Sequence, residues 1–255
     1  QTTGRVRWSG AKVIAGTLLL VPGLKPEHFD RVAAHGSKFA KFLFYPLDEN
    51  PEEARNYVKW CRERGMRTKV HTGGVSRSGS SQLCGYDILS WLQPDIAAHV
   101  SGGPIPMSDE DLDQVIDKTS FALEICSSGN YGSTARAVKR LMQRDSLHRL
   151  CLGTDTPGGT GVIPRGMFKN ILFLTSICGL TTGQAIAVAT GNTAQAHGLN
   201  CGVLDIGRPA DIVIGGPVKG SAGTSFSDAI AHGDFPGITH VLVDGMPVVL
   251  GRSHQ

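Results

Sequence analysis

The sequence lacks the features that mark several large classes of protein. It has no uninterrupted apolar run near the ~20 residues that a membrane-spanning helix needs, and the longest run, residues 13–21, is broken by Gly16 and Thr17. Its 25 basic and 22 acidic residues are scattered, and the formal net charge is only +3. No basic surface for nucleic acid or lipid is indicated. We therefore expect a chain that binds neither nucleic acid nor membrane.

Close cysteine pairs are also missing. The six cysteines include no C-x-x-C pair, and several lie in apolar segments that have the pattern of a strand or a helix. This favours buried free thiols in a reducing compartment, so we predict a cytoplasmic location.

What the sequence does contain is an alternation of short apolar segments with amphipathic ones. Strands are predicted at residues 11–14, 39–44, 67–71, 95–99, 121–126 and 150–154. The clearest helix between them spans residues 50–64, and another begins at Ser108, where the sequence SDED resembles a capping box. Alternating strands and helices predict a parallel sheet of the α/β class.

Six parallel strands fit either a doubly wound sheet or an incomplete eight-stranded barrel. A doubly wound nucleotide-binding domain should carry G-x-G-x-x-G or a P-loop after its first strand, and neither is present there. After residue 154 the pattern changes. Helices are predicted at 164–178 and 181–189, and strands at 210–214, 240–243 and 248–250. This second part is predicted to be a small β appendage that begins near Gly198.

Three polar residues stand at the carboxyl ends of predicted strands: His71, His99 and Asp155. In a parallel barrel these strand ends form the rim that carries the active site. Two neutral imidazoles and a carboxylate are ligands that suit a hydrolytic metal ion. A single histidine at a strand end is more often a loop residue with a hydrogen bond, and a lone GTDTP turn is more often a helix cap. The combination on one array of strands favours a metal site.

Lys41 is a fourth candidate because it lies inside an apolar strand, where its charge needs a partner or must be lost. Carbon dioxide could carboxylate it and so turn it into a bridging carboxylate. From the residues alone, a lysine that reaches the rim or faces outward to a helix is the favoured interpretation.

An ordered set of motifs resembles the amidohydrolase superfamily, and most closely its enamidase-like members, which open cyclic enamides. The matching pieces are VHTGG at 70–74, HVSGGP at 99–104, GTDTP at 153–157, GTG at 159–161, ATGN at 189–192, GVL at 202–204, GRPADIV at 207–213 and DG at 244–245. The resemblance covers nearly the whole chain, and it implies a metal-dependent hydrolase of carbon–nitrogen bonds.

The resemblance also implies roles for the candidate residues. His71 and His99 would bind the more exposed metal ion, and Asp155 would bind the other one and act as general base and proton shuttle. Lys41 would be the carboxylated lysine that many superfamily members have, although enamidase-like relatives have a glutamate near this point. The expected cofactor is zinc, or zinc with iron as a binuclear centre. The expected partner is a small-molecule amide substrate, in a homo-oligomeric enzyme.

One motif of the superfamily is absent, since no H-x-H pair occurs in the chain. We therefore expect a (β/α)₈ TIM barrel of the metal-dependent hydrolase type that is N-terminally incomplete. Residues 1–198 would carry its C-terminal six strands, and residues 199–255 would form the C-terminal half of a β-sandwich appendage. The open alternatives are another superfamily reaction, namely imidazolone, hydantoin or dipeptide hydrolysis or deamination, and an inactive fragment or pseudoenzyme.

Overall fold

The computed structural model describes residues 3–5, 11–14, 17–77, 80–102, 105–156 and 161–250. Its centre is a six-stranded sheet in which all neighbouring strands are parallel. The strand order is β10-β9-β8-β5-β4-β3. The strands are β3 (Thr17–Leu19), β4 (Phe39–Phe42), β5 (Arg67–His71), β8 (Ile96–Ala98), β9 (Ala122–Ile125) and β10 (Leu150–Leu152). The predicted α/β fold with a parallel sheet is therefore confirmed, and a TIM-barrel arrangement is consistent with it.

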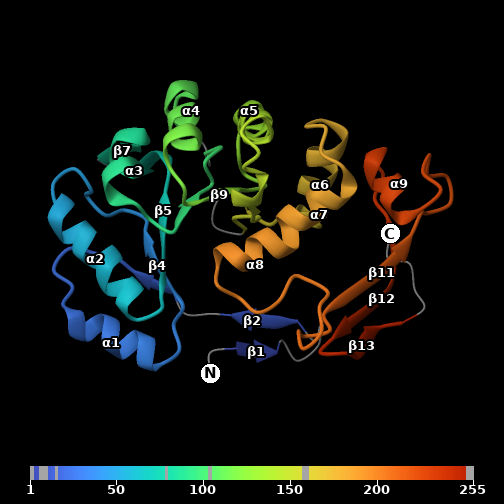
Figure 1. The fold of residues 1–255 in the computed structure, drawn as a ribbon, viewed down its shortest axis with the longest axis horizontal. Coiled ribbons are helices and arrows are strands. Elements are labelled where there is room, and N and C mark those ends of the chain that lie inside the picture. The colour runs from blue at the N-terminus through green and yellow to red at the C-terminus, as the bar shows by residue number, and fades with distance from the viewer. Residues whose placement is uncertain are drawn as a thin grey trace.

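Helices connect these strands and follow the last of them, and they curve around the sheet in Figure 1. They are α1 (Pro26–Ala34), α2 (Pro51–Glu63), α3 (Tyr86–Leu92), α4 (Asp109–Lys118), α5 (Tyr131–Gln143), α6 (Gly166–Ser176), α7 (Thr182–Ala187) and α8 (Thr193–Ala196), with a 3-10 turn at Leu147–Arg149 and a π-helix at Val188–Asn192 between α7 and α8. Ser108 caps α4 as predicted, since its hydroxyl accepts a hydrogen bond from the Asp111 N–H. No described helix is long and apolar enough to cross a membrane.

One predicted strand is present but was expected in the wrong sheet. Residues Lys12–Ile14 form β2, which pairs in antiparallel fashion with β1 (Thr3–Arg5) and not with the parallel sheet. The first strand of that sheet is β3 instead, and its Leu18 packs against the core while Val13 and Ile14 are about 40% exposed. Both strands lie in one apolar run, and apolar character alone does not say which half is covered by helices.

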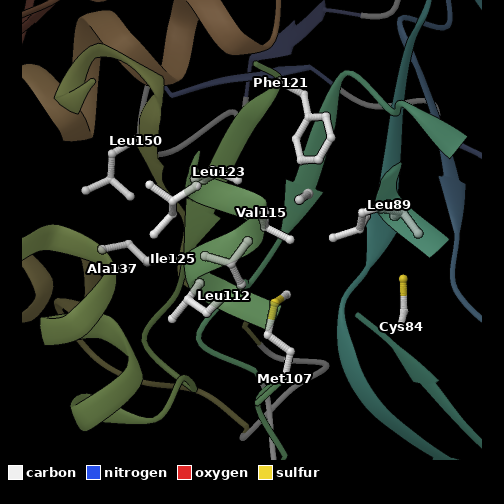
Figure 2. Close-up of a cluster of buried hydrophobic side chains, with 14 of the residues drawn as sticks. Cys84, Leu89, Met107, Leu112, Val115, Phe121, Leu123, Ile125, Ala137 and Leu150 are labelled. Atoms are coloured by element: carbon white, nitrogen blue, oxygen red, sulfur yellow. The ribbon is translucent and has the colours of Figure 1, made fainter. Parts of the chain in front are cut away.

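The apolar core lies between the sheet and the helices outside it. Leu123 and Ile125 of β9 point to this side and join one buried cluster with Leu112 and Val115 of α4 and Ala137 of α5 (Figure 2). Successive residues of a strand point to opposite faces, so the intervening residue of β9, Glu124, points to the inner face of the sheet. The two faces therefore carry residues of different chemistry.

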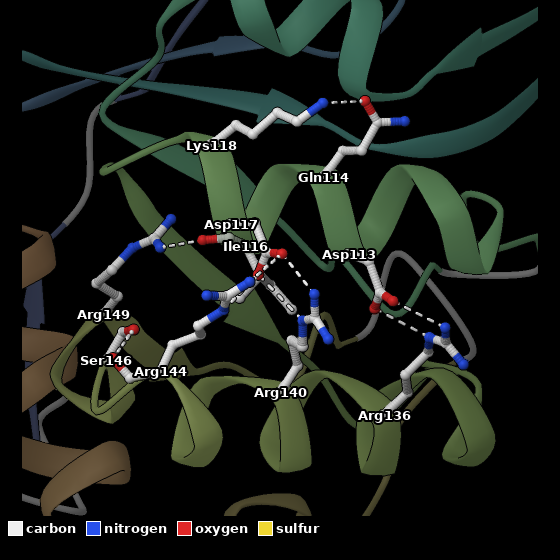
Figure 3. A network of polar contacts seen from close by, with 10 residues as sticks. All are labelled: Asp113, Gln114, Ile116, Asp117, Lys118, Arg136, Arg140, Arg144, Ser146 and Arg149. Atoms are coloured by element: carbon white, nitrogen blue, oxygen red, sulfur yellow. Dashed lines mark hydrogen bonds and ion pairs between the residues drawn. The ribbon is translucent and has the colours of Figure 1, made fainter.

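A ladder of ion pairs joins the exposed sides of α4 and α5 (Figure 3). Arg136 pairs with Asp113, and Asp117 accepts hydrogen bonds from both Arg140 and Arg144. The repeat of one arginine per helical turn on α5 matches acidic residues one turn apart on α4. This ladder fixes how the two helices lie against each other on the outer surface.

The C-terminal part forms a separate antiparallel sheet in the order β11-β12-β13. Its strands are β11 (Ile212–Gly216), β12 (Gly237–Val243) and β13 (Met246–Val249), and helix α9 (Phe226–Ala231) lies between the first two in sequence. Lys12 of β2 pairs with Asp211, at 2.8 Å, and with Asp244 beside this sheet. The N-terminal hairpin therefore contacts the C-terminal sheet (Figure 1), while the predicted division after residue 198 stays a prediction.

Candidate functional site

His71 and His99 lie side by side at the carboxyl ends of neighbouring strands. His71 is the last residue of β5, and His99 follows β8 directly; the two strands pair with His71 opposite Ala98. The imidazole ring centroids are 4.2 Å apart, with the planes at 66°. The sequence-based expectation that the strand ends bring these two residues together is therefore confirmed in geometry.

Both imidazoles are held in the neutral form. Burial is the largest cause that lowers the pKa of His71, and burial together with the nearby Lys41 lowers the pKa of His99 to about 2. Neutral imidazole is the form that binds metal ions. The Nδ1 atom of His99 is buried and has no hydrogen-bond partner within the described part of the chain. A buried nitrogen without a partner is costly unless something else satisfies it.

The backbone around the two histidines is unusual. His99 has a φ of 39°, in the left-handed region that side-chain-bearing residues rarely adopt, and such strain gathers at functional sites. Gly73 and Gly102 follow the two histidines, and a Cβ on either would lie within 2.4 Å of the backbone of Ile105 or Pro106. The glycines thus let both loops pack against one segment, which holds the histidines in place.

Asp155 lies beyond the end of β10, which stops at Leu152, and it is exposed. It also has a left-handed backbone, with a φ of 55°. Its carboxylate accepts a hydrogen bond from the Ser128 hydroxyl at 3.2 Å. Burial lowers the pKa of both His71 and Lys41, and the nearby negative charge of Asp155 offsets a small part of that lowering.

Lys41 points to the inner face of β4, because its neighbours Ala40 and Phe42 are the ones buried in the sheet–helix core. The interpretation of an outward-facing lysine is therefore wrong. Burial, followed by the nearby charge of Lys69, lowers the pKa of Lys41 to about 8. The charged form of this side chain still predominates at neutral pH, but a minor share of it is the neutral amine.

A second charged group lies on the inner face, and it was not predicted from the sequence. Lys69 of β5 forms an ion pair with Glu124 of β9, across the intervening β8. His197, after α8, has its Nε2 4.0 Å from the same Glu124 oxygen, and its ring packs edge-on against Phe39. Lys69 stands two residues before His71, on the same face, so the period-two alternation of β5 was a signal for it.

The two histidines fit a metal ion, but they do not complete a site. Their rings converge and favour the neutral form. The buried Nδ1 of His99 has no hydrogen-bond partner among the described residues, as expected of a nitrogen that binds a metal ion or another ligand. Yet no group of three or more His, Cys, Asp or Glu side chains in the described ranges is close enough to hold a metal. Asp155 and Lys41 are near the pair without closing around it.

A family model for the amidohydrolases matches residues 46–248. The chain belongs to the amidohydrolase family. This amidohydrolase is 36% identical over 243 residues to an enamidase from Eubacterium barkeri, which covers 95% of this chain and 63% of that protein. The resemblance identified from the motifs is therefore confirmed.

Solved structures agree. A crystal structure of enamidase superposes with a TM-score of 0.91 at 35% identity, over 97% of this chain and 64% of that one. A dihydroorotase (TM-score 0.57, 12% identity, 91% of this chain and 65% of that one) and an N-acetyl-D-glucosamine-6-phosphate deacetylase from Mycobacterium smegmatis (TM-score 0.56, 17% identity, 89% and 59%) share the fold alone. The chain thus spans less than two thirds of the length of the enamidases that it matches.

Some of the motif residues cannot be placed in this picture. Residues 103–104 of HVSGGP, residue 157 of GTDTP and residues 159–160 of GTG lie outside the described residues. The ATGN motif at 189–192 lies in the π-helix, where Asn192 donates to the carbonyl oxygens of Leu147 and Leu150. This motif therefore anchors the helical segment to the start of β10.

Proposed function

We propose that this amidohydrolase hydrolyses a carbon–nitrogen bond of the cyclic amide or enamide type in a small molecule. The observation that carries the proposal is the pair of neutral, converging imidazoles of His71 and His99, with the orphaned Nδ1 of the latter, at the ends of adjacent parallel strands. The likeness to enamidase supports the substrate class.

The proposed cofactor is zinc, or zinc with iron. His71 and His99 would hold the metal, with Asp155 and a carboxylated Lys41 as further ligands. A bound metal ion supplies Lewis acidity, which lowers the pKa of a water molecule and polarises a carbonyl. Superfamily members depend on metal ions, which supports this assignment.

Asp155 is proposed to move the proton. Its carboxylate accepts a proton from the attacking water, the water oxygen bonds to the amide carbon, and the carbon–nitrogen bond breaks as the same proton passes to the leaving nitrogen. The exposed position of Asp155, near the histidine pair, suits a group that must contact both water and substrate.

Lys41 is proposed to react with carbon dioxide. Its neutral Nζ would bond to the carbon of CO₂ and release one proton, which leaves a carbamate anion. The lowered pKa of Lys41 supports this step, because only the unprotonated amine is a nucleophile.

All six cysteines are free thiols, and four of them are buried. This fits a reducing environment, and it supports the proposal of a cytoplasmic enzyme.

The test is turnover on a panel of substrates, with and without an Asp155→Asn substitution. The panel contains cyclic amides and enamides together with an imidazolone, a hydantoin, a dipeptide and a deaminase substrate. Hydrolysis of the cyclic amides or enamides, abolished in D155N while most metal is kept, is the expected result. Turnover of another compound would reassign the reaction, and turnover that survives D155N would remove Asp155 from it. No turnover of any compound would favour an inactive protein.

A further inference from the structure

The loop after β9 supports Asp155 through a chain of two hydrogen bonds. The Ser128 hydroxyl lies 3.2 Å from Oδ2 of Asp155, and the Cys126 Sγ lies 2.9 Å from the same hydroxyl oxygen. Cys126 is the first residue after β9 and is only 6% exposed. The three side chains thus connect Cys126, at the end of β9, to Asp155, which lies beyond the end of β10.

The direction of both hydrogen bonds follows from the number of protons. An ionised carboxylate can only accept, so Ser128 must donate to Asp155. A hydroxyl has one proton to give, so the thiol of Cys126 must donate to Ser128. Burial raises the pKa of this thiol, which keeps it protonated and able to donate. Each member of the chain therefore has a defined role.

The loop that carries Ser128 is itself held rigidly. The amide of Asn170, on α6, donates both to the Ser127 hydroxyl and to the Gly153 carbonyl oxygen, each at 3.0 Å. This one side chain ties the loop after β9 to the backbone just before Asp155. Gly166 packs closely beside it, since a Cβ there would lie 3.0 Å from the Ser127 hydroxyl.

Asp155 needs such support more than the histidines do. It is exposed, its backbone is left-handed, and no other hydrogen bond to its carboxylate comes from the described residues. A carboxylate on a short side chain at an open rim would otherwise sample several rotamers. Partners that orient a ligand or a proton-transfer group contribute strongly to metal affinity and rate.

We propose that Ser128 is a positioning residue that fixes the carboxylate of Asp155 in the orientation used for metal binding and proton transfer, with Cys126 orienting the Ser128 hydroxyl. The inference rests on the role of Asp155 in the proposed function.

The test compares Ser128→Ala with Ser128→Thr and Cys126→Ser in the whole chain, with Ser146→Ala as a matched control. Ser146 also bonds through its hydroxyl, but to the Arg144 carbonyl oxygen away from the site. Two quantities are measured: the zinc dissociation constant by calorimetry, and the orientation of Asp155 in crystals grown without metal. S128A is expected to raise the dissociation constant about 10-fold and to leave Asp155 in several rotamers. S128T and C126S are expected to match the parent protein because each keeps a hydroxyl in the hydrogen-bonded series that ends at Asp155. S146A is expected to match it because Ser146 lies outside that series.

The two readouts separate this inference from the proposed function. If the parent chain binds no zinc but S128A still releases Asp155 in the crystal, the positioning role stands and the metal-dependent mechanism fails. If Asp155 keeps a single orientation in S128A, or if S128T disorders it as much as S128A does, the hydroxyl of Ser128 does not position it and the inference is overturned.

Discussion

The two faces of strand β9 carry residues of opposite chemistry. Leu123 and Ile125 are buried in the sheet–helix core, with exposures of 0% and 2%. Glu124, between them, faces inward and pairs with Lys69. On β5, Thr68 and Val70 are likewise buried on the outer side, while Lys69 and His71 face inward.

The difference shows that alternate residues of a strand serve different purposes. Residues on the outer face stabilise the fold, and residues on the inner face carry the charged and titratable groups. The outer face obeys hydrophobic burial, which is the main stabilising contribution to folding. The inner face places charged and titratable groups near one another, where each needs a partner or a changed pKa. Substitutions on the outer face should therefore cost the most stability, whereas those on the inner face should cost less stability and also change metal binding and catalysis.

Leu123→Ala is expected to have the largest effect on stability. It removes a fully buried side chain from the core in Figure 2 and leaves a cavity, so the free energy of unfolding should fall by about 2–5 kcal/mol. Urea denaturation followed by circular dichroism measures this, and the zinc affinity of the folded variant should stay unchanged. A loss below about 1 kcal/mol would mean that this face is not the main core.

Lys69→Met tests the inner face. The free energy of unfolding is expected to fall by a smaller amount, about 1–3 kcal/mol, because the substitution leaves Glu124 buried without its cation. The double variant K69M/E124L removes both charges and should recover most of that loss. If the double variant is as unstable as the sum of the single variants K69M and E124L, the two side chains are not coupled and the pair does not organise the inner face.

Asp117→Asn tests the ladder of ion pairs in Figure 3. It is expected to lower the free energy of unfolding by about 1 kcal/mol. Hydrogen bonds from Arg140 and then Arg144 lower the pKa of Asp117 to about 2. A carboxyl with a lowered folded-state pKa stabilises the fold above its ordinary pKa near 4, and that contribution is lost as the pH falls toward 2. Parent and D117N should thus differ at pH 7 and converge near pH 2 in thermal unfolding, whereas a constant difference would contradict the ion-pair origin.

Local patterns predicted much of the fold. Five of the six strands of the parallel sheet appear where their apolar runs indicate, since a buried strand needs a short apolar segment and little else. The run at 11–14 was assigned to the wrong sheet because pairing depends on distant residues, such as the contact of Lys12 with Asp211. The π-helix and the β6–β7 hairpin (Gly73–Arg77 and Ser80–Cys84) left no comparable signal.

The sequence alone could predict only those residues of the candidate site that stand at the carboxyl end of a predicted strand. His71 and His99 were found in this way, and parallel neighbours guarantee that such ends meet. Ser128 was not found, because its importance lies in a contact with Asp155, 27 residues away. The Lys69–Glu124 pair likewise joins strands that are not neighbours. Contacts of this kind become visible only when the fold places the segments together.

The central claim, that His71 and His99 hold a metal ion, is tested most directly by measuring zinc binding. The proteins compared are the parent, the double variant His71→Asn/His99→Asn and the control His148→Asn. His148 is exposed and lies at the start of β10, away from the carboxyl strand ends. The account predicts that the parent and H148N bind zinc, that the double variant loses it, and that all three unfold at the same urea concentration. Equal zinc binding by the double variant and the parent would contradict the account, because the inner strand ends would then not hold the metal.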